Sequence, residues 1–246
     1  PSRVTINRWV EEQTENRIKD LLPQGSIDTL TRLVLTNAVY FNAAWESQFE
    51  ERATAPGVFH LVGGGEVSVP MMRQTAYFGY SQGAGVTAIE LPYDGNELSM
   101  VILLPDEGQF AAFEDAVDND ALRDVIDRLQ RTRVDLRMPK FRMETSFGLN
   151  DALTQLGMES AFDSERADFS GMDGTRDLYI TDVVHKAFVE VDEFGTEAAA
   201  ATAVVVGTTS MPPDPIEVTV DRPFLFLIQD IETSTVLFLG RVMNPA

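Results

Sequence analysis

Strand-like stretches come in two long blocks in this sequence and do not alternate one by one with helices. Glycine-rich turns part the short strands expected in the first block, which covers residues 58–80 and 86–105. The second block is expected at residues 178–191, 216–220, 224–231 and 236–242. The clearest helical pattern, residues 110–129, lies between the blocks. This order predicts an α+β fold with mostly antiparallel sheets, because a parallel sheet needs regular strand–helix alternation.

Other elements are expected from local periodicity. Apolar residues at helical spacing predict a first helix that Pro23 and Gly25 end, and these residues are Ile6, Trp9, Val10, Ile18, Leu21 and Leu22. A short second helix is expected from Asp28. Residues 33–41 predict a buried strand, 134–141 an alternating strand, and 149–156 a short helix that ends at Gly157. No linker divides the chain, so a single domain over residues 1–246 is expected.

Charge and composition exclude several classes of protein. Thirty-nine acidic residues against nineteen basic ones give a net charge of −20, which disfavours nucleic acid and anionic membranes as partners. No apolar run approaches the roughly 18 residues that a membrane-spanning helix needs. The chain has no cysteine, so disulfides and thiolate chemistry are excluded. Only three of the basic residues are Lys, and such an Asp-rich, Lys-poor surface suggests a protein adapted to high salt.

Residues 198–213 (AAAATAVVVGTTSMPP) carry no charge in a chain that is 24 % charged. A buried strand and an Ala-rich helix are the ordinary explanations. Three consecutive β-branched residues, 204–206, followed by Gly207 argue against a helix, and four consecutive alanines offer little to pack in a core. A mobile, exposed or insertable strand is the third explanation.

Motifs for catalysis and metal binding are weak. Gly79–Gly83 fits the G-x-S-x-G pattern, with Ser81 as nucleophile and His185 as its base, but a strand-like stretch follows where that motif needs a helix. A hairpin turn is therefore expected there. Four aspartates lack the spacing of a calcium loop and fit a solvated helix face: Asp115, Asp118, Asp120 and Asp124. His60 and His185 have no metal-ligand spacing, so neither a metal nor a cofactor is predicted.

Two segments that flank the uncharged stretch are distinctive: residues 193–202 (EFGTEAAAAT) and 221–226 (DRPFLF). Three further motifs occur at residues 35–45 (LTNAVYFNAAW), 184–188 (VHKAF) and 238–245 (FLGRVMNP), together with the segment 162–171. In this combination and order the chain strongly resembles the serpin family of serine protease inhibitors. The resemblance covers essentially the whole chain and implies the serpin fold, incomplete at its N-terminus by about a third of the domain.

The resemblance implies a reactive loop at about residues 193–221 and a scissile bond between Thr209 and Ser210. Val206, Thr208 and Met211 are the alternatives if the loop register slips. The hinge of this loop would be formed by Glu193, Gly195, Thr196, Glu197, Ala198, Ala199, Ala200, Ala201 and Thr202. The resemblance also implies a shutter pair, Asn37 and His185, joined by a buried hydrogen bond, and a breach tryptophan, Trp45.

Alternation along an extended chain puts Thr196, Ala198, Ala200, Thr202 and Val204 on one face and Glu197 on the other. Since Glu197 must stay in water, the small residues are expected to face inward, which lets the segment enter a sheet without burying an unpaired charge. The expected function is inhibition of a serine protease as a suicide substrate, with no catalytic residue of its own. The alternative is a non-inhibitory serpin that acts as a carrier or storage protein.

The expected partner is a serine protease that accepts small residues, elastase-like or subtilisin-like, because Thr209 is small and uncharged. The protein is expected to be a monomer. Its compartment is unknown from the sequence, with a secreted or extracellular location as the favoured hypothesis.

Overall fold

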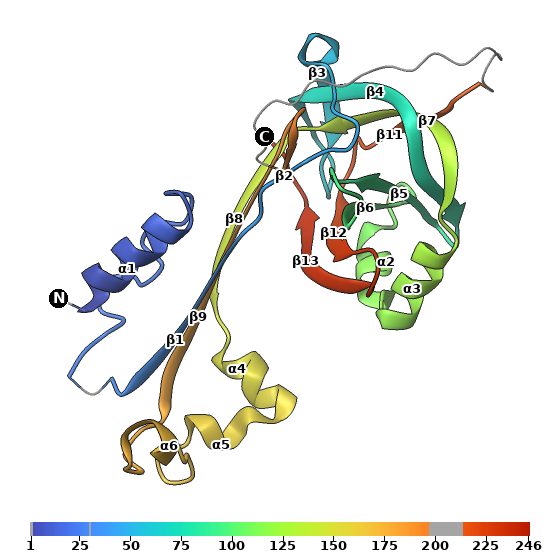
Figure 1. Cartoon of the computed structure of the whole chain (residues 1–246). Helices are drawn as coiled ribbons and strands as arrows, with labels where there is room; N and C mark the ends of the chain where they lie inside the picture. Colours follow the sequence, from blue (N-terminus) through green and yellow to red (C-terminus); the bar gives the residue numbers. More distant parts are fainter. Residues whose placement is uncertain (1, 30, 197–213) are drawn as a thin grey trace. The chain divides into compact units, whose positions relative to one another are not determined.

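The computed structural model describes residues 2–29, 31–196 and 214–246 (Figure 1). Contacts within the chain group these residues into two compact units. Unit 1 comprises Pro1–Phe41 and Met143–Val189, and unit 2 comprises Asn42–Arg142 and Glu190–Ala246. Sheets and helices both contribute, so the predicted α+β class is confirmed. The division into two units leaves the expected single domain a prediction.

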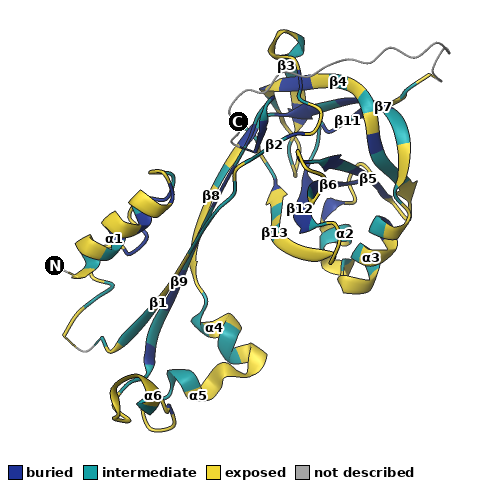
Figure 2. Cartoon of the chain, viewed as in Figure 1, coloured by how far each residue is buried: buried dark blue, intermediate teal, exposed yellow. Residues whose placement is uncertain are grey.

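Unit 2 is built on an eight-stranded sheet with the order β11-β7-β4-β5-β6-β12-β13, and β3 pairs with β4. All neighbouring strands are antiparallel except β11, which runs parallel to β7. The strands are β3 (Ala55–His60), β4 (Glu66–Gly83), β5 (Val86–Pro92), β6 (Leu98–Pro105), β7 (Gln130–Pro139), β11 (Ile216–Thr219), β12 (Phe224–Asp230) and β13 (Thr235–Val242). The sequence located each of these strands by its alternating or apolar pattern, and β6 and β12 are almost wholly buried (Figure 2).

Two helices cover one face of this sheet where a single helix over 110–129 is expected. They are α2 (Phe110–Ala116) and α3 (Asn119–Asp127). Val117 between them is extended, and the Asp118 carboxylate caps α3 by accepting the backbone N–H groups of Asp120 and Ala121 at 3.1 and 2.9 Å. The prediction of one helix is wrong because this cap starts a second helix without changing the apolar pattern.

Unit 1 contains α1 (Ser2–Gln13), β1 (Leu33–Tyr40) and most of β8 (Phe141–Gly148) and β9 (Ile180–Val191), two strands that continue into unit 2. Its short helices are α4 (Asn150–Leu153), η2 (Thr154–Met158), α5 (Glu159–Phe162) and α6 (Ser170–Asp173). β1 pairs in parallel with β9, and β8 pairs with β9. Val10, Ile18, Leu21 and Leu22 pack against Val184 and Phe188 in the core of this unit.

The first helix is shorter than the sequence suggests. It ends at Gln13, and Glu15 and Asn16 then take positive φ angles of 49° and 63°. A turn brings the later apolar residues back into the core, and the Asn7 amide holds it through two 2.9 Å hydrogen bonds with the backbone of Leu22. Trp9, expected on the inward face, is 59 % exposed in the described part of the chain.

Two other expectations in unit 1 are wrong. No helix begins at Asp28, whose carboxylate instead accepts the Thr31 N–H at 2.8 Å in a turn. β1 is partly exposed rather than buried, since residues 35–37 all lie open in the described part of the chain. A third expectation is confirmed: the helix expected over 149–156 ends at Gly157, whose φ of 102° is not helical, and a separate helix, α5, begins at Glu159.

No helix among residues 2–29, 31–196 and 214–246 is long and apolar enough to cross a membrane.

Candidate functional site: the start of the hinge

Two residues of the expected hinge form a short strand, β10 (Gly195–Thr196). It pairs antiparallel with β2 (Ala43–Ala44), and Thr196 also pairs with Val191 at the end of β9. The Asp192 carboxylate accepts the backbone N–H groups of Phe194 and Gly195 at 2.9 and 3.2 Å, which closes the tight turn before the strand. The expected inward position of Thr196 agrees with its complete burial.

Gly195 lies where the chain leaves no room for a side chain. A Cβ added there would overlap the carbonyl oxygen of Ala43 and lie 2.7 Å from the Cα of Ala44. Its φ of 159° is also a conformation that favours glycine. The close pairing of β10 with β2 therefore depends on glycine at this position.

Glu193 is a buried carboxylate with two side-chain partners. Lys140 Nζ lies 2.7 Å from one oxygen, and the Thr54 hydroxyl donates to the other at 2.7 Å. Burial alone would raise the pKa of Glu193, but the hydrogen bonds from Lys140 and Thr54 outweigh it and hold the pKa below its usual value. Glu193 also accepts the Phe49 N–H at its backbone carbonyl. Glu193, the first residue of the expected hinge, is thus held in this turn by a paired, charged side chain.

Trp45 packs beside the same turn. Its ring stacks on Tyr93 with centroids 4.7 Å apart and an interplanar angle of 12°. Its indole N–H donates to the carbonyl of Asp192 at 3.0 Å, and its backbone N–H donates to Phe194. The Tyr93 hydroxyl lies 2.7 Å from the Thr196 hydroxyl, and burial raises the pKa of Tyr93, so this hydroxyl stays neutral. The predicted breach tryptophan therefore touches the start of the hinge directly.

Sequence reasoning missed four of the residues that contact the hinge. They are Thr54, Tyr93, Lys140 and Asp192. Lys140 carries the one usable signal, since it is one of three lysines in a chain dominated by Arg. Its partner lies 53 positions later, and no local pattern connects the two.

Asn37 and His185, the expected shutter pair, face one another in the register of β1 and β9. Asn37 is exposed, and His185 Nδ1 is buried with no hydrogen-bond partner within the described residues. The ring of His185 lies 5.0 Å from the ring of Phe147. The expected hydrogen bond between Asn37 and His185 is therefore not found among the described residues, and the shutter role of the pair stays a prediction.

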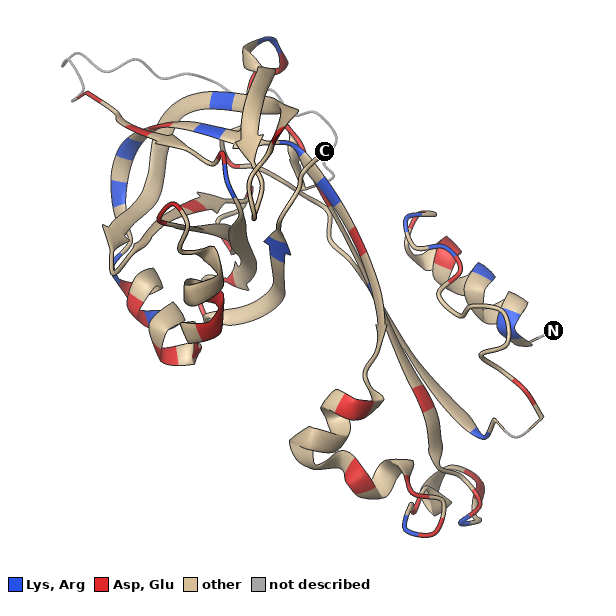
Figure 3. Cartoon of the chain, turned by 180° about the vertical axis from the view of Figure 1, so that it is seen from behind, with Lys and Arg blue, Asp and Glu red and all other residues tan. Residues whose placement is uncertain are grey.

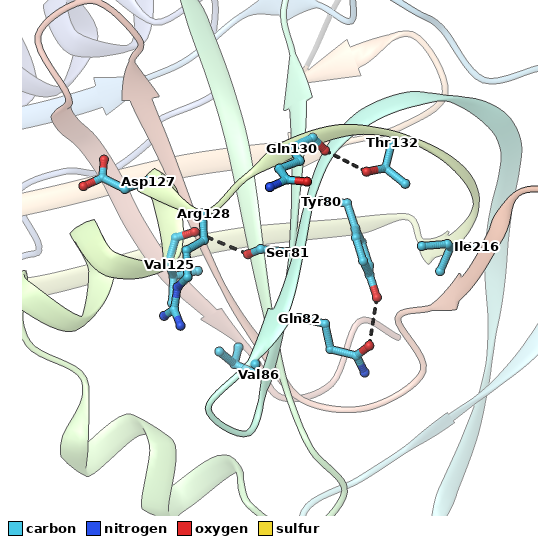
Figure 4. Close-up of a pocket in the computed structure, with 11 residues that line it drawn as sticks. Tyr80, Ser81, Gln82, Val86, Val125, Asp127, Arg128, Gln130, Thr132 and Ile216 are labelled. Carbon is cyan, nitrogen blue, oxygen red and sulfur yellow. Dashed lines mark hydrogen bonds between the residues drawn. The ribbon is translucent and has the colours of Figure 1, made fainter.

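Ser81 lies within β4, not at a strand–helix turn. Ala84 and Gly85 have φ angles of 52° and 79° and join β4 to β5, which is the geometry of a tight hairpin. The Ser81 hydroxyl donates to the carbonyl of Val125 at 3.3 Å in a pocket of about 560 Å³ (Figure 4). The hairpin prediction is confirmed, and the nucleophile motif has no structural counterpart here.

The remaining candidates fall into two groups. His60 lies on β3, with its Nδ1 3.4 Å from a carboxylate oxygen of Glu66, and Asp118 caps α3. Within the described residues, no group of three or more His, Asp or Glu side chains could hold a metal ion. The expected reactive bond, Thr209–Ser210, its alternatives, and the hinge residues from Glu197 to Thr202 lie outside the described residues.

Comparisons with known proteins agree with this arrangement. The family model described as serpin, serine protease inhibitor, matches residues 1–245. An uncharacterized serpin-like protein of Thermococcus kodakarensis is 46 % identical over 243 residues, which are 98 % of this chain and 56 % of that protein. Leukocyte elastase inhibitor A of Rattus norvegicus is 44 % identical over 253 residues, covering 99 % of this chain and 66 % of that protein.

Among solved structures, uncleaved ovalbumin matches with a TM-score of 0.87 and 30 % identity, covering 99 % of this chain and 62 % of ovalbumin. The chain belongs to the serpin family and has the serpin fold. It spans between about half and two thirds of the length of these relatives.

Proposed function

We propose that this serpin inhibits a serine protease as a suicide substrate, through cleavage of the reactive loop and its insertion into a sheet. The observation that carries the proposal is β10. The first two residues of the expected insertion segment, Gly195 and Thr196, already form a strand that is paired with β2 and with the end of β9. Insertion then needs only the lengthening of an existing strand, which avoids the cost of starting a new one.

The pairing of β9 supports the proposal that insertion lowers the free energy of the protein. β9 pairs in parallel with β1 from Ile180 to Phe188 and meets β10 only at Val191. Lengthening β10 along β9 replaces one parallel ladder by two antiparallel ladders, one on each side of the inserted strand. Because antiparallel pairing is slightly more stable per residue and adds hydrogen bonds, the inserted state is favoured once cleavage frees the loop.

The side chains of the insertion segment are compatible with a buried position. Thr196 is fully buried and contacts the Tyr93 hydroxyl. The residues that share its face by alternation are small and uncharged: Ala198, Ala200, Thr202 and Val204. None of these residues would bring an unpaired charge into the sheet. Burial of such a charge would cost several kcal/mol.

The protease supplies the chemistry. Its serine oxygen attacks the carbonyl carbon of Thr209, the C–N bond to Ser210 breaks, and Ser210 leaves with the proton as a new amino terminus. The bond that forms is an ester between the protease and Thr209. Insertion of residues 195–209 moves this ester about 50 Å, at roughly 3.3 Å per residue, and the attached protease is distorted before water hydrolyses the ester.

A protease with a small specificity pocket fits this loop best. Thr209 is small and neutral, and a relative that is 44 % identical is a leukocyte elastase inhibitor. We therefore propose an elastase-like or subtilisin-like protease as the target. The inhibitor is proposed to act as a monomer.

The test is incubation of the full-length protein with pancreatic elastase and with subtilisin, followed by denaturing gels and mass analysis of the released peptide. A complex that survives boiling, with a peptide that begins at Ser210, supports the mechanism and the bond. A peptide that begins elsewhere with a stable complex corrects the bond alone. Cleavage by both proteases without any complex overturns the mechanism and favours the carrier or storage alternative.

A further inference from the structure

The outer face of β4, β7 and β11 in unit 2 carries an unusual set of arginines. Residues that face each other across antiparallel strands share one side of the sheet. Arg73 faces Arg137 in this way, and Tyr77 faces Arg133. By alternation along β7, Arg131 lies on the same side. We call Arg73, Arg131, Arg133 and Arg137 the arginine face, and Figure 3 shows basic positions gathered along β4 and β7.

Folding stability does not explain this arrangement. Like charges directly opposite on neighbouring strands are destabilising, and Arg73 lies opposite Arg137. Asp135 offsets Arg73 by accepting its Nε and Nη2 at 2.9 and 2.6 Å. Arg131 lies 5.0 Å over the Tyr77 ring, and neither Arg131 nor Arg137 has a carboxylate within ion-pair distance among the described residues.

The acidic residues near this face are few. Asp135 lies between Arg133 and Arg137 on the same side of β7, and Glu217 of β11 is its register partner. Asp221, which lines a groove of about 440 Å³ together with Arg73 and Arg137, is paired with Arg222 at 3.1 Å. Four arginines against Asp135 and Glu217 leave the face at 4 − 2 = +2, in a chain whose net charge is −20. The face is therefore a positive island in an acidic protein.

Chain connectivity sets the position of this face relative to the proposed reactive bond. Five residues lie between Ser210 and Ile216, the first residue of β11, and these six Cα-to-Cα steps can span at most about 22 Å. A small globular domain is roughly 30 Å across. A protease bound at Thr209–Ser210 thus lies within one protein diameter of β11, which is paired along its length with β7.

From these observations we propose that the arginine face is a docking surface for the target protease, and that it selects a protease with clustered Asp and Glu around its active-site cleft. This inference depends on the proposed inhibitory function and adds a determinant of specificity outside the loop. Charge complementarity of this kind acts on the rate of encounter more than on the lifetime of the complex, and salt screens it.

The test compares two double variants of the full-length protein. R131E/R137E reverses the two arginines without ion-pair partners among the described residues, and R8E/R123E makes the same change in net charge at two exposed positions on other elements, α1 and α3. The association rate constant is measured at low and high salt with two serine proteases that cleave the loop, one with an acidic rim and one with a neutral rim. We expect R131E/R137E to slow association with the acidic protease about tenfold at low salt and little at high salt.

Equal rates for the two double variants overturn the docking surface and leave the inhibitory function intact. A slower rate of R131E/R137E with both proteases alike also overturns it, because the effect would not depend on partner charge. Tight binding of sulfated dextran at physiological salt, lost in R131E/R137E and without effect on protease association, would assign the face to a polyanion instead.

A second readout separates this inference from the proposed function. If the wild-type protein forms no covalent complex, the inhibitory function fails, and equilibrium binding to the acidic protease with its catalytic serine replaced by alanine is measured. Weaker binding by R131E/R137E than by R8E/R123E supports the docking surface, and equal binding overturns it.

Discussion

Single residues decide whether the hinge is held in place. Gly195 admits no side chain because the backbone of Ala43 and Ala44 occupies the space that a Cβ would take. We expect Gly195→Ala to destabilise the protein by about 1–3 kcal/mol, the usual cost of overpacking. Thermal or urea unfolding measures this. Gly148→Ala is the matched control, since nothing lies within 4 Å of its Cβ position, and equal stability of both variants would contradict the argument.

Glu193 links the hinge to acid stability. The pKa of Glu193 in the folded chain lies below its usual value of about 4.3. The stabilisation that the charged carboxylate gives to the folded state is therefore complete above about pH 4.3 and is lost as the pH falls below that value. We expect Glu193→Gln to lower the free energy of unfolding at pH 7 by about 1–3 kcal/mol. The low end of this range is expected, because Lys140 is partly exposed and solvent screens its charge. The loss should shrink toward pH 3.

Unfolding free energy measured between pH 3 and pH 7 checks this prediction. The control is Glu50→Gln, which removes an exposed carboxylate paired with Arg52 and should change little at either pH. A difference between wild type and Glu193→Gln that stays constant across this pH range would refute the role of the charged pair.

At the scale of secondary structure, the hinge strand gives a sharp test of insertion. Thr196 is fully buried against Tyr93, so Thr196→Arg must place a charge in a buried position. We expect this variant to be cleaved normally but to form little covalent complex, turning an inhibitor into a substrate. Thr196→Ser keeps the hydroxyl and should retain inhibition. If the Arg variant inhibited as many protease molecules per inhibitor molecule as the wild type, insertion would be ruled out.

The break between α2 and α3 depends on the Asp118 cap. Asp118→Ala removes the acceptor for two backbone N–H groups, and we expect a loss of about 1 kcal/mol. Asp115→Ala on the preceding helix is the control and should be near neutral. Circular dichroism during urea unfolding measures both, and equal midpoints would show that the cap contributes nothing.

The sequence was sufficient where a local pattern decides the structure. Alternation and turn glycines located the strands of unit 2, and the hinge over residues 193–202 stays a prediction from the family resemblance, of which the described residues include only 193–196. Sequence patterns failed where contacts between residues far apart in the sequence decide the structure. Ile18, Leu21 and Leu22 continue the helical spacing of α1 yet lie in a turn that Asn7 holds. The anchors of the hinge, Lys140 and Tyr93, could not be predicted because their partners lie far away in the sequence.

For the whole molecule, the net charge of −20 predicts a dependence on salt. Repulsion among so many carboxylates opposes the compact state, and screening at molar salt, where the Debye length is about 3 Å, relieves it. We expect the melting temperature to rise between 0.05 M and 2 M KCl. An equal rise in sucrose solution would point to solvent exclusion instead, and no rise in KCl would end the hypothesis of adaptation to salt.

The two tryptophans give this chain a built-in optical probe. Trp9 is 59 % exposed, whereas Trp45 is 3 % exposed and stacked on Tyr93 beside the hinge. With Trp9 replaced by Phe, all indole fluorescence would come from Trp45. Its emission would then report, in real time and without an attached dye, when the first residues of the loop begin to move.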